Sequence, residues 1–139
     1  MAKEMINVEW NNKMSFTTEV SGHKITIDAN QSVGGEDSGP RPKPLMLTAL
    51  GGCTGMDVVS ILKKMRLELD YFNVKVEAEM TEEHPKHYNK FHITYQFKGK
   101  DLPMDKLEKA VSLSEERYCG VSFMYKKFAE VTSAIEILD

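Results

Sequence analysis

The stretch that most constrains this fold is a long apolar run over residues 44–66. Between Leu45 and Leu62 the only charged side chain is Asp57. Pro44 suits the first position of a helix, because its missing N–H needs no partner there. The run is apolar on nearly every face, which predicts a helix covered on all sides. Its length is at the lower limit of about 17–25 residues for a membrane span, and its polar and small residues favour a core helix instead.

Glycines surround Cys53 in the middle of this predicted helix, at Gly51, Gly52 and Gly55. Each glycine costs a helix about 0.8–1.0 kcal/mol relative to alanine. Either another backbone approaches closely here, or the Cys53 thiol needs open space around it. A lone cysteine on an apolar helix is most often a small buried hydrophobe, and that interpretation stays open.

The composition bounds the class of protein. A chain of 139 residues suits one domain, residues 1–139. With 41% hydrophobic and 28% charged residues it can build a core without disulfide bonds. A net charge of −3 and the lack of a basic stripe argue against a nucleic-acid partner. The first residues lack the apolar segment of a signal peptide, so we expect a cytoplasmic protein without a membrane partner.

The sequence contains two cysteines, Cys53 and Cys119. In a reducing cytoplasm, such thiols are more often free, metal-bound or redox-active than permanently bridged. Neither cysteine has a second pair of metal ligands near it in the sequence. His84 and His87 are the other candidate metal ligands, but Pro85 lies between them and no third ligand is evident. We therefore expect no metal site and no cofactor.

Apolar and polar residues alternate in a way that predicts strands and helices in a mixed order. Three strands at residues 5–10, 14–20 and 23–29 are expected to form an antiparallel meander with a Ser21–Gly22 turn. Two further strands at 72–80 and 91–98 are expected to form a hairpin, and a last strand is expected within 128–138. Helices are expected at 103–117 and 123–127. The order is typical of an α+β fold. One sheet covers only one side of the apolar helix, so a second copy of the chain is expected to cover the other.

Two segments outside the apolar helix carry candidate functional residues. A glycine- and proline-rich loop over residues 30–43 leads into that helix, and loops of this length are often functional. It carries Glu36, Asp37 and Arg41. Cys119 lies at the junction of the two later helices, where first-turn N–H groups can favour a thiolate.

Two blocks of sequence together resemble the OsmC/Ohr family, the osmotically inducible and organic hydroperoxide resistance proteins. The first comprises Gly39-Pro40-Arg41-Pro42, Leu45 to Cys53, Met56-Asp57-Val58-Val59 and Ile61-Leu62, and the second is Glu116-Arg117-Tyr118-Cys119-Gly120-Val121-Ser122. The resemblance covers nearly the whole chain. It implies an OsmC-like fold, with antiparallel sheets wrapped around a long buried cysteine-bearing helix in an intertwined homodimer.

The resemblance also implies roles for the two thiols. Cys53 corresponds to the cysteine that attacks an organic hydroperoxide, and Cys119 to the cysteine that resolves the resulting sulfenic acid as a disulfide. A dithiol such as a lipoylated protein then reduces that disulfide. These steps suit a thiolate nucleophile beside a second thiol.

The sequence departs from active family members around the first cysteine. Those members have a glutamate where this chain has Lys43 or Pro44, and an arginine on an early strand. A buried thiol needs a nearby cation to lower its pKa. Arg41 or Lys43 is therefore the candidate activator, with Glu36 or Asp37 to orient it. Asp57, one helical turn from Cys53, disfavours the thiolate unless a cation pairs with it.

Three functions stay open at this point, because a fold does not fix a function. The first is a thiol-dependent peroxidase that reduces organic hydroperoxides through Cys53 and Cys119. The second is a non-catalytic OsmC-like protein that binds a small apolar ligand or senses oxidants. The third is a structural dimer with two core thiols.

Overall fold

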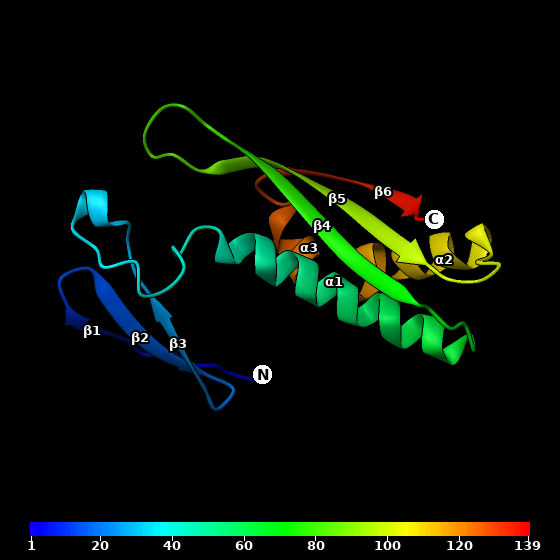
Figure 1. Cartoon of the computed structure of the whole chain (residues 1–139), viewed down its shortest axis with the longest axis horizontal. Helices are drawn as coiled ribbons and strands as arrows, with labels where there is room; N and C mark the ends of the chain where they lie inside the picture. The colour runs from blue at the N-terminus through cyan, green and yellow to red at the C-terminus, as the bar shows by residue number, and fades with distance from the viewer. The chain divides into compact units, whose positions relative to one another are not determined.

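The computed structural model describes all 139 residues of the chain. They form two compact units, residues Met1–Met46 and Leu47–Asp139. Figure 1 shows the elements of both units. Helices and two separate sheets make an α+β structure, as the sequence predicts. The expected single domain over residues 1–139 stays a prediction.

The first unit contains an antiparallel sheet in the order β1-β2-β3, which confirms the predicted meander. Ser21 and Gly22 form the predicted two-residue turn, with φ angles of 53° and 82° that match the twist of a hairpin. The elements are β1 (Val8–Asn12), β2 (Ser15–Val20), β3 (His23–Ile27) and a 3-10 turn, η1 (Gln31–Val33).

Strand β1 differs from its predicted range of residues 5–10, because it starts later and runs through the expected turn to Asn12. The side-chain amide of Asn11 donates to Ser15 Oγ at 2.8 Å and to Thr17 Oγ1 at 2.9 Å. These bonds to the neighbouring strand keep Asn11 in the sheet, although asparagine is usually a turn residue.

The Asp28 carboxylate orders the loop that follows β3. Its oxygens accept hydrogen bonds from the backbone N–H groups of Ala29 at 2.7 Å, Glu36 at 3.2 Å and Ser38 at 3.1 Å. The Ser38 hydroxyl also donates to it, at 2.7 Å. The Ser38 hydroxyl, followed by the backbone donors, holds the pKa of Asp28 well below its usual range.

The second unit packs helices against a sheet in the order β4-β5-β6. Strands β4 and β5 form the predicted antiparallel hairpin, and β6 runs parallel to β5. The strands are β4 (Tyr71–Met80), β5 (Tyr88–Lys98) and β6 (Glu130–Ile137); the helical elements are α1 (Leu45–Lys64), α2 (Met104–Leu113), η2 (Ser114–Tyr118) and α3 (Gly120–Tyr125).

Strand β5 is the centre of the core, because it is paired along both edges and its inward side chains are fully buried. These side chains are Phe91, Ile93, Tyr95 and Phe97, which confirms the predicted alternation. The helices cover this face of the sheet (Figure 1), as the contacts of Tyr95 with Thr54 and of Phe91 with Tyr125 also show.

Helix α1 packs against the sheet through one stripe at four-residue spacing: Leu50, Thr54, Val58 and Leu62. A Cβ atom on Gly51 or Gly55 would stand 3.2 Å from a methyl group of Val76 or Val74, whereas Gly52 faces open space. The glycines at 51 and 55 therefore let the β4 side chains approach the helix closely, which accounts for their cost in helix propensity.

Burial of α1 differs from the predicted cover on all sides. Within a single chain only the stripe against the sheet is buried, while Met56 and Val59 are 77% and 48% exposed. One sheet covers one side of a helix, so complete cover needs a second surface.

The predicted helix boundaries differ from the structure at one place that matters for the thiols. The helix expected over residues 103–117 is α-helical only to Leu113 and continues as the π-helical turn η2. The short helix expected at residues 123–127 begins earlier, at Gly120. Cys119 therefore lies between η2 and α3. π-Helical turns often occur at functional sites.

Candidate active site

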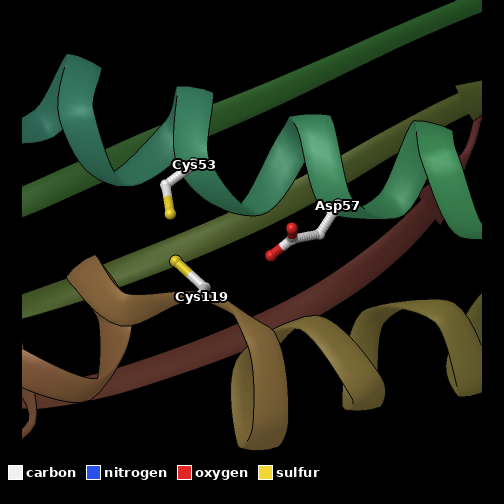
Figure 2. Close-up of side chains that lie close together, drawn as sticks. All are labelled: Cys53, Asp57 and Cys119. Carbon is white, nitrogen blue, oxygen red and sulfur yellow. The ribbon is translucent and has the colours of Figure 1, made fainter.

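The two cysteines face one another in the second unit. Cys53 comes from the middle of α1, and Cys119 lies between η2 and α3. Figure 2 shows the two thiols pointing toward one another, with the Asp57 carboxylate turned toward both. The two sulfur atoms and a carboxylate oxygen of Asp57 all lie within 4.8 Å of one another. The fold thus brings together three residues that the sequence singles out.

The environments of the two thiols differ. Cys53 is half-buried, whereas Cys119 is 3% exposed. The sulfur of Cys119 caps α3 by accepting a hydrogen bond from the Ser122 N–H at 3.3 Å. Burial nevertheless raises the pKa of the Cys119 thiol to about 12, and the hydrogen bond with Cys53 and the charge of Asp57 act in the same direction.

The helix N–H groups favour a Cys119 thiolate, as expected, but their effect is too small to produce one. The Ser122 N–H does lower the pKa of Cys119, but burial outweighs it. At neutral pH Cys119 is a protonated thiol that donates rather than a thiolate that attacks.

Asp57 ends a buried chain of hydrogen bonds. Ser114 Oγ donates to Asp57 Oδ2 at 2.9 Å and lies 2.8 Å from Thr54 Oγ1. Thr54 Oγ1 lies 2.8 Å from Tyr95 Oη, which donates to Glu115 Oε2 at 2.6 Å. The chain joins a carboxylate beside the thiols to a second carboxylate on η2.

The hydroxyl groups of this chain hold Asp57 in a defined orientation. Thr54 and Ser114 are fully buried, as is Tyr95. Burial, followed by the hydrogen bond to Glu115, raises the pKa of Tyr95 far above its usual range, so its hydroxyl stays a donor. Buried polar networks that are fully bonded are rigid, and this rigidity extends to the Asp57 side chain.

An open groove of about 470 Å³ has Asp57 in its lining. Its walls are mostly apolar and are formed by α1, the end of α2 and η2. Lys64 is the one positively charged residue in the lining. The lining residues are Asp57, Ser60, Ile61, Lys64, Leu113 and Tyr118. A groove of this size accommodates a small organic molecule.

The loop residues predicted as activators lie in the first unit. Arg41 Nη1 donates to Asp37 Oδ1 at 2.6 Å and to the Gly39 carbonyl oxygen at 3.1 Å. Glu36 forms an ion pair with Lys13 at 3.7 Å. Asp37 therefore pairs with Arg41, and its role in orienting an activating cation stays a prediction. The action of Arg41 or Lys43 on Cys53 stays a prediction.

Sequence reasoning missed the hydroxyl side of the site. Thr54 and Ser114 carry hydroxyl groups on helix faces that are otherwise apolar. A polar residue on an apolar face was the sequence signal that could have identified them as part of the site. Nothing in the sequence indicates that Tyr95 and Glu115 meet, because they come from a strand and a later π-helical turn.

Two comparisons with known proteins match most of the chain. The family model of OsmC-like proteins matches residues 35–133. Protein YhfA of Escherichia coli K12 is 36% identical over 132 residues, covering 94% of this chain and 96% of its own.

Solved structures share the fold over the whole chain. A hypothetical protein from Aquifex aeolicus has a TM-score of 0.82 and 31% identity, with both chains fully covered. An organic hydroperoxide resistance protein OsmC from Legionella pneumophila has a TM-score of 0.67 and 14% identity, covering 98% of this chain and 99% of its own.

Helix α1 is the one helix that is long and apolar enough to cross a membrane by length and composition, with a mean hydropathy of 1.6. It lies within the region that the family model matches. The matched residues also include both cysteines and Asp57. By the family match, and by its likeness to YhfA along nearly its full length, this chain belongs to the family of OsmC-like proteins.

Proposed function

We propose that this protein is a thiol-dependent peroxidase that reduces organic hydroperoxides through Cys53 and Cys119. The observation that carries the proposal is the placement of the two thiols, whose sulfur atoms face one another within 4.8 Å. A sulfenic acid formed on one is then within reach of the other after a small side-chain movement. Solved structures of the same fold include organic hydroperoxide resistance proteins, from Legionella pneumophila among others.

The chemistry balances with these groups alone and one dithiol. The Cys53 thiolate attacks the terminal oxygen of ROOH, the O–O bond breaks, and RO⁻ takes up the proton that the thiol lost to leave as ROH. The Cys53 sulfenic acid and the Cys119 thiol then form a disulfide and water. A dithiol, such as a lipoylated protein, reduces the disulfide and is itself oxidised to a disulfide.

The assignment of roles follows from exposure. Cys53 is half-buried, so a substrate can reach its sulfur. Cys119 is almost fully buried, and burial raises its pKa to about 12. In the resolving step the Cys119 sulfur attacks the sulfenic sulfur of Cys53, and the Cys119 proton leaves with the sulfenic oxygen as water.

The substrate class follows from the groove beside Asp57. Its apolar walls, formed by Ile61, Leu113 and Tyr118, favour an organic hydroperoxide over hydrogen peroxide. Arg41 or Lys43 is the proposed source of the positive charge that favours the Cys53 thiolate.

A second candidate is an OsmC-like protein that binds an apolar ligand or senses oxidants without turnover. The observation that favours it is the Asp57 carboxylate beside the thiols, since negative charge disfavours a thiolate. The same groove then serves as the ligand site.

The proposal includes a homodimer in the cytoplasm. Helix α1 buries only one stripe within a single chain, and large apolar side chains of α1 and α3 stay exposed: Met56, Val59, Phe123 and Met124. A second copy would remove this apolar surface from water.

The proposal is tested by titrating the reduced protein with cumene hydroperoxide and reading intact mass and free thiols. Stoichiometric loss of both thiols with a mass loss of about two hydrogens is expected, and Cys53→Ser or Cys119→Ser should abolish it. Turnover with a dithiol separates a peroxidase from a sensor. Unreactive thiols at millimolar peroxide would contradict both and leave ligand binding, read by a fluorescent apolar probe.

A further inference from the structure

The cluster of Cys53, Asp57 and Cys119 has a property that peroxide chemistry does not use. Its ligand-type atoms, two sulfurs and one carboxylate oxygen, lie within 4.8 Å of one another and converge on one point (Figure 2). Two of the three residues are half-buried, and Cys119 is 3% exposed. The sequence singles out these three residues for thiol chemistry, and no metal site is expected from it.

We propose that the reduced cluster binds one divalent zinc-type cation through Cys53 Sγ, Cys119 Sγ and a carboxylate oxygen of Asp57. Sulfur and carboxylate ligands with three protein groups and one open position are typical of accessible zinc sites. Zn–S bonds of about 2.3 Å put two tetrahedral sulfur ligands about 3.8 Å apart. The present separations, at most 4.8 Å, need side-chain movements of about 1 Å or less.

The surroundings hold two of the ligands in place. Ser114 Oγ donates to Asp57 Oδ2 at 2.9 Å, and Ser114 is itself fixed by Thr54 at 2.8 Å. The Ser122 N–H donates to Cys119 Sγ at 3.3 Å. Groups that bond to ligands in this way orient them and strengthen metal binding. Cys53 and Asp57 are one helical turn apart, so the rigid helix fixes their spacing.

Metal binding and thiol oxidation exclude one another at this cluster, because both use the same sulfur atoms. Binding displaces the two thiol protons to solvent, so that two thiolates and one carboxylate surround the cation. A two-electron oxidant such as diamide takes the electrons of both thiolates, and two protons from solvent, to become a hydrazine while the Cys53–Cys119 disulfide forms. The cation then leaves. This cycle requires no peroxidase activity.

The test measures Co²⁺ binding to the reduced full-length chain, since thiolate ligation gives a near-ultraviolet charge-transfer band and tetrahedral geometry gives strong visible bands. About one ion per chain is expected. Both band sets should vanish in Cys53→Ser and Cys119→Ser. Zinc should displace cobalt, and its affinity is then read by competition with a chromogenic chelator.

Variants separate the proposed site from binding by two thiols alone. Ser114→Ala should weaken zinc binding about 10-fold, and Asp57→Asn should weaken it more. Glu108→Gln, an exposed carboxylate on α2, is the matched control and should leave affinity unchanged. Circular dichroism checks that each variant folds. Equal zinc affinity in a folded Asp57→Asn and the wild type would overturn the proposal.

A readout without variants completes the test. Zinc should protect both wild-type thiols from alkylation, and diamide should release the bound zinc in step with disulfide formation. Alkylation of both thiols at an unchanged rate under saturating zinc would overturn the proposal. No peroxide is used, so a failed peroxidase assay and a failed metal assay are independent results.

Discussion

Thr54 shows how a single buried hydroxyl supports the site. It lies next to Cys53 in the sequence, is fully buried, and bonds to both Tyr95 and Ser114 at 2.8 Å. Thr54→Val keeps the shape but leaves both partners short of a hydrogen bond, which should lower the free energy of unfolding by about 1–3 kcal/mol. Urea denaturation of the variant and the wild type measures this difference in the free energy of unfolding.

The control for Thr54 is Thr54→Ser, which keeps the hydroxyl and loses one methyl group. It should cost about 0.8 kcal/mol for the lost burial, less than the valine variant. A valine variant as stable as the wild type would mean that the hydroxyl chain contributes no net stability.

Asp28 makes the stability of the first unit depend on pH. The donors around it hold its pKa well below the value of about 3.9 expected in the unfolded chain. A lowered native pKa means that the unfolded state takes up the proton first as pH falls. The stabilisation is therefore complete at neutral pH and is lost progressively below about pH 5.

Asp28→Asn should remove this stabilisation and its pH dependence. An asparagine amide group would face N–H groups that now meet a carboxylate oxygen. Thermal unfolding across the acid range should show a lower melting temperature at neutral pH and a flatter decline with acid. Asp37→Asn, which breaks only the exposed pair with Arg41, should change stability by less than about 1 kcal/mol. If the melting temperatures of Asp28→Asn and the wild type fell in parallel with decreasing pH, Asp28 would not be the source of the pH dependence.

At the scale of elements, the contact of α1 with β4 depends on glycines in α1, which have no side chain to hold the strand away. A Cβ atom on Gly55 would stand 3.2 Å from Val74 Cγ2. Val76 makes the same kind of close contact, but with Gly51 and not with Gly55. Gly55→Ala and Val74→Ala should therefore couple in a double-mutant cycle by at least about 0.5 kcal/mol, because removing the valine methyls relieves the crowding.

The control cycle pairs Gly55→Ala with Val76→Ala, and these changes should be additive within about 0.5 kcal/mol. Denaturation of the single and double variants gives both coupling energies. Equal coupling in the two cycles would show that the close approach is not specific to the 55–74 pair.

Elements with a clear period could be predicted from the sequence, and irregular ones could not. The alternation of Phe91, Ile93, Tyr95 and Phe97 predicts β5 correctly, since burial on one face imposes a period of two. The π-helical turn at Ser114–Tyr118 was not predictable, because it is a local widening of a helix with unchanged residue types.

At the scale of the molecule, the candidate site shows the same limit. The resemblance to the OsmC/Ohr family points to Cys53 and Cys119, and helical spacing places Asp57 beside Cys53. No local pattern indicates that Thr54, Ser114 and Tyr95 join in one chain of hydrogen bonds. Such contacts depend on packing between elements distant in the sequence, which residue types alone do not encode.

The proposed homodimer makes the exposed side of α1 an interface. Met56 is 77% exposed on this apolar helix, so Met56→Lys would place a charge in a contact that excludes water. Sedimentation at micromolar concentration should show a dimer for the wild type and mainly a monomer for this variant. Ser112→Lys adds the same charge at an exposed position of α2 and should stay dimeric. A wild-type monomer would contradict the dimer, and a dimeric Met56→Lys would exclude this side of α1 as its interface.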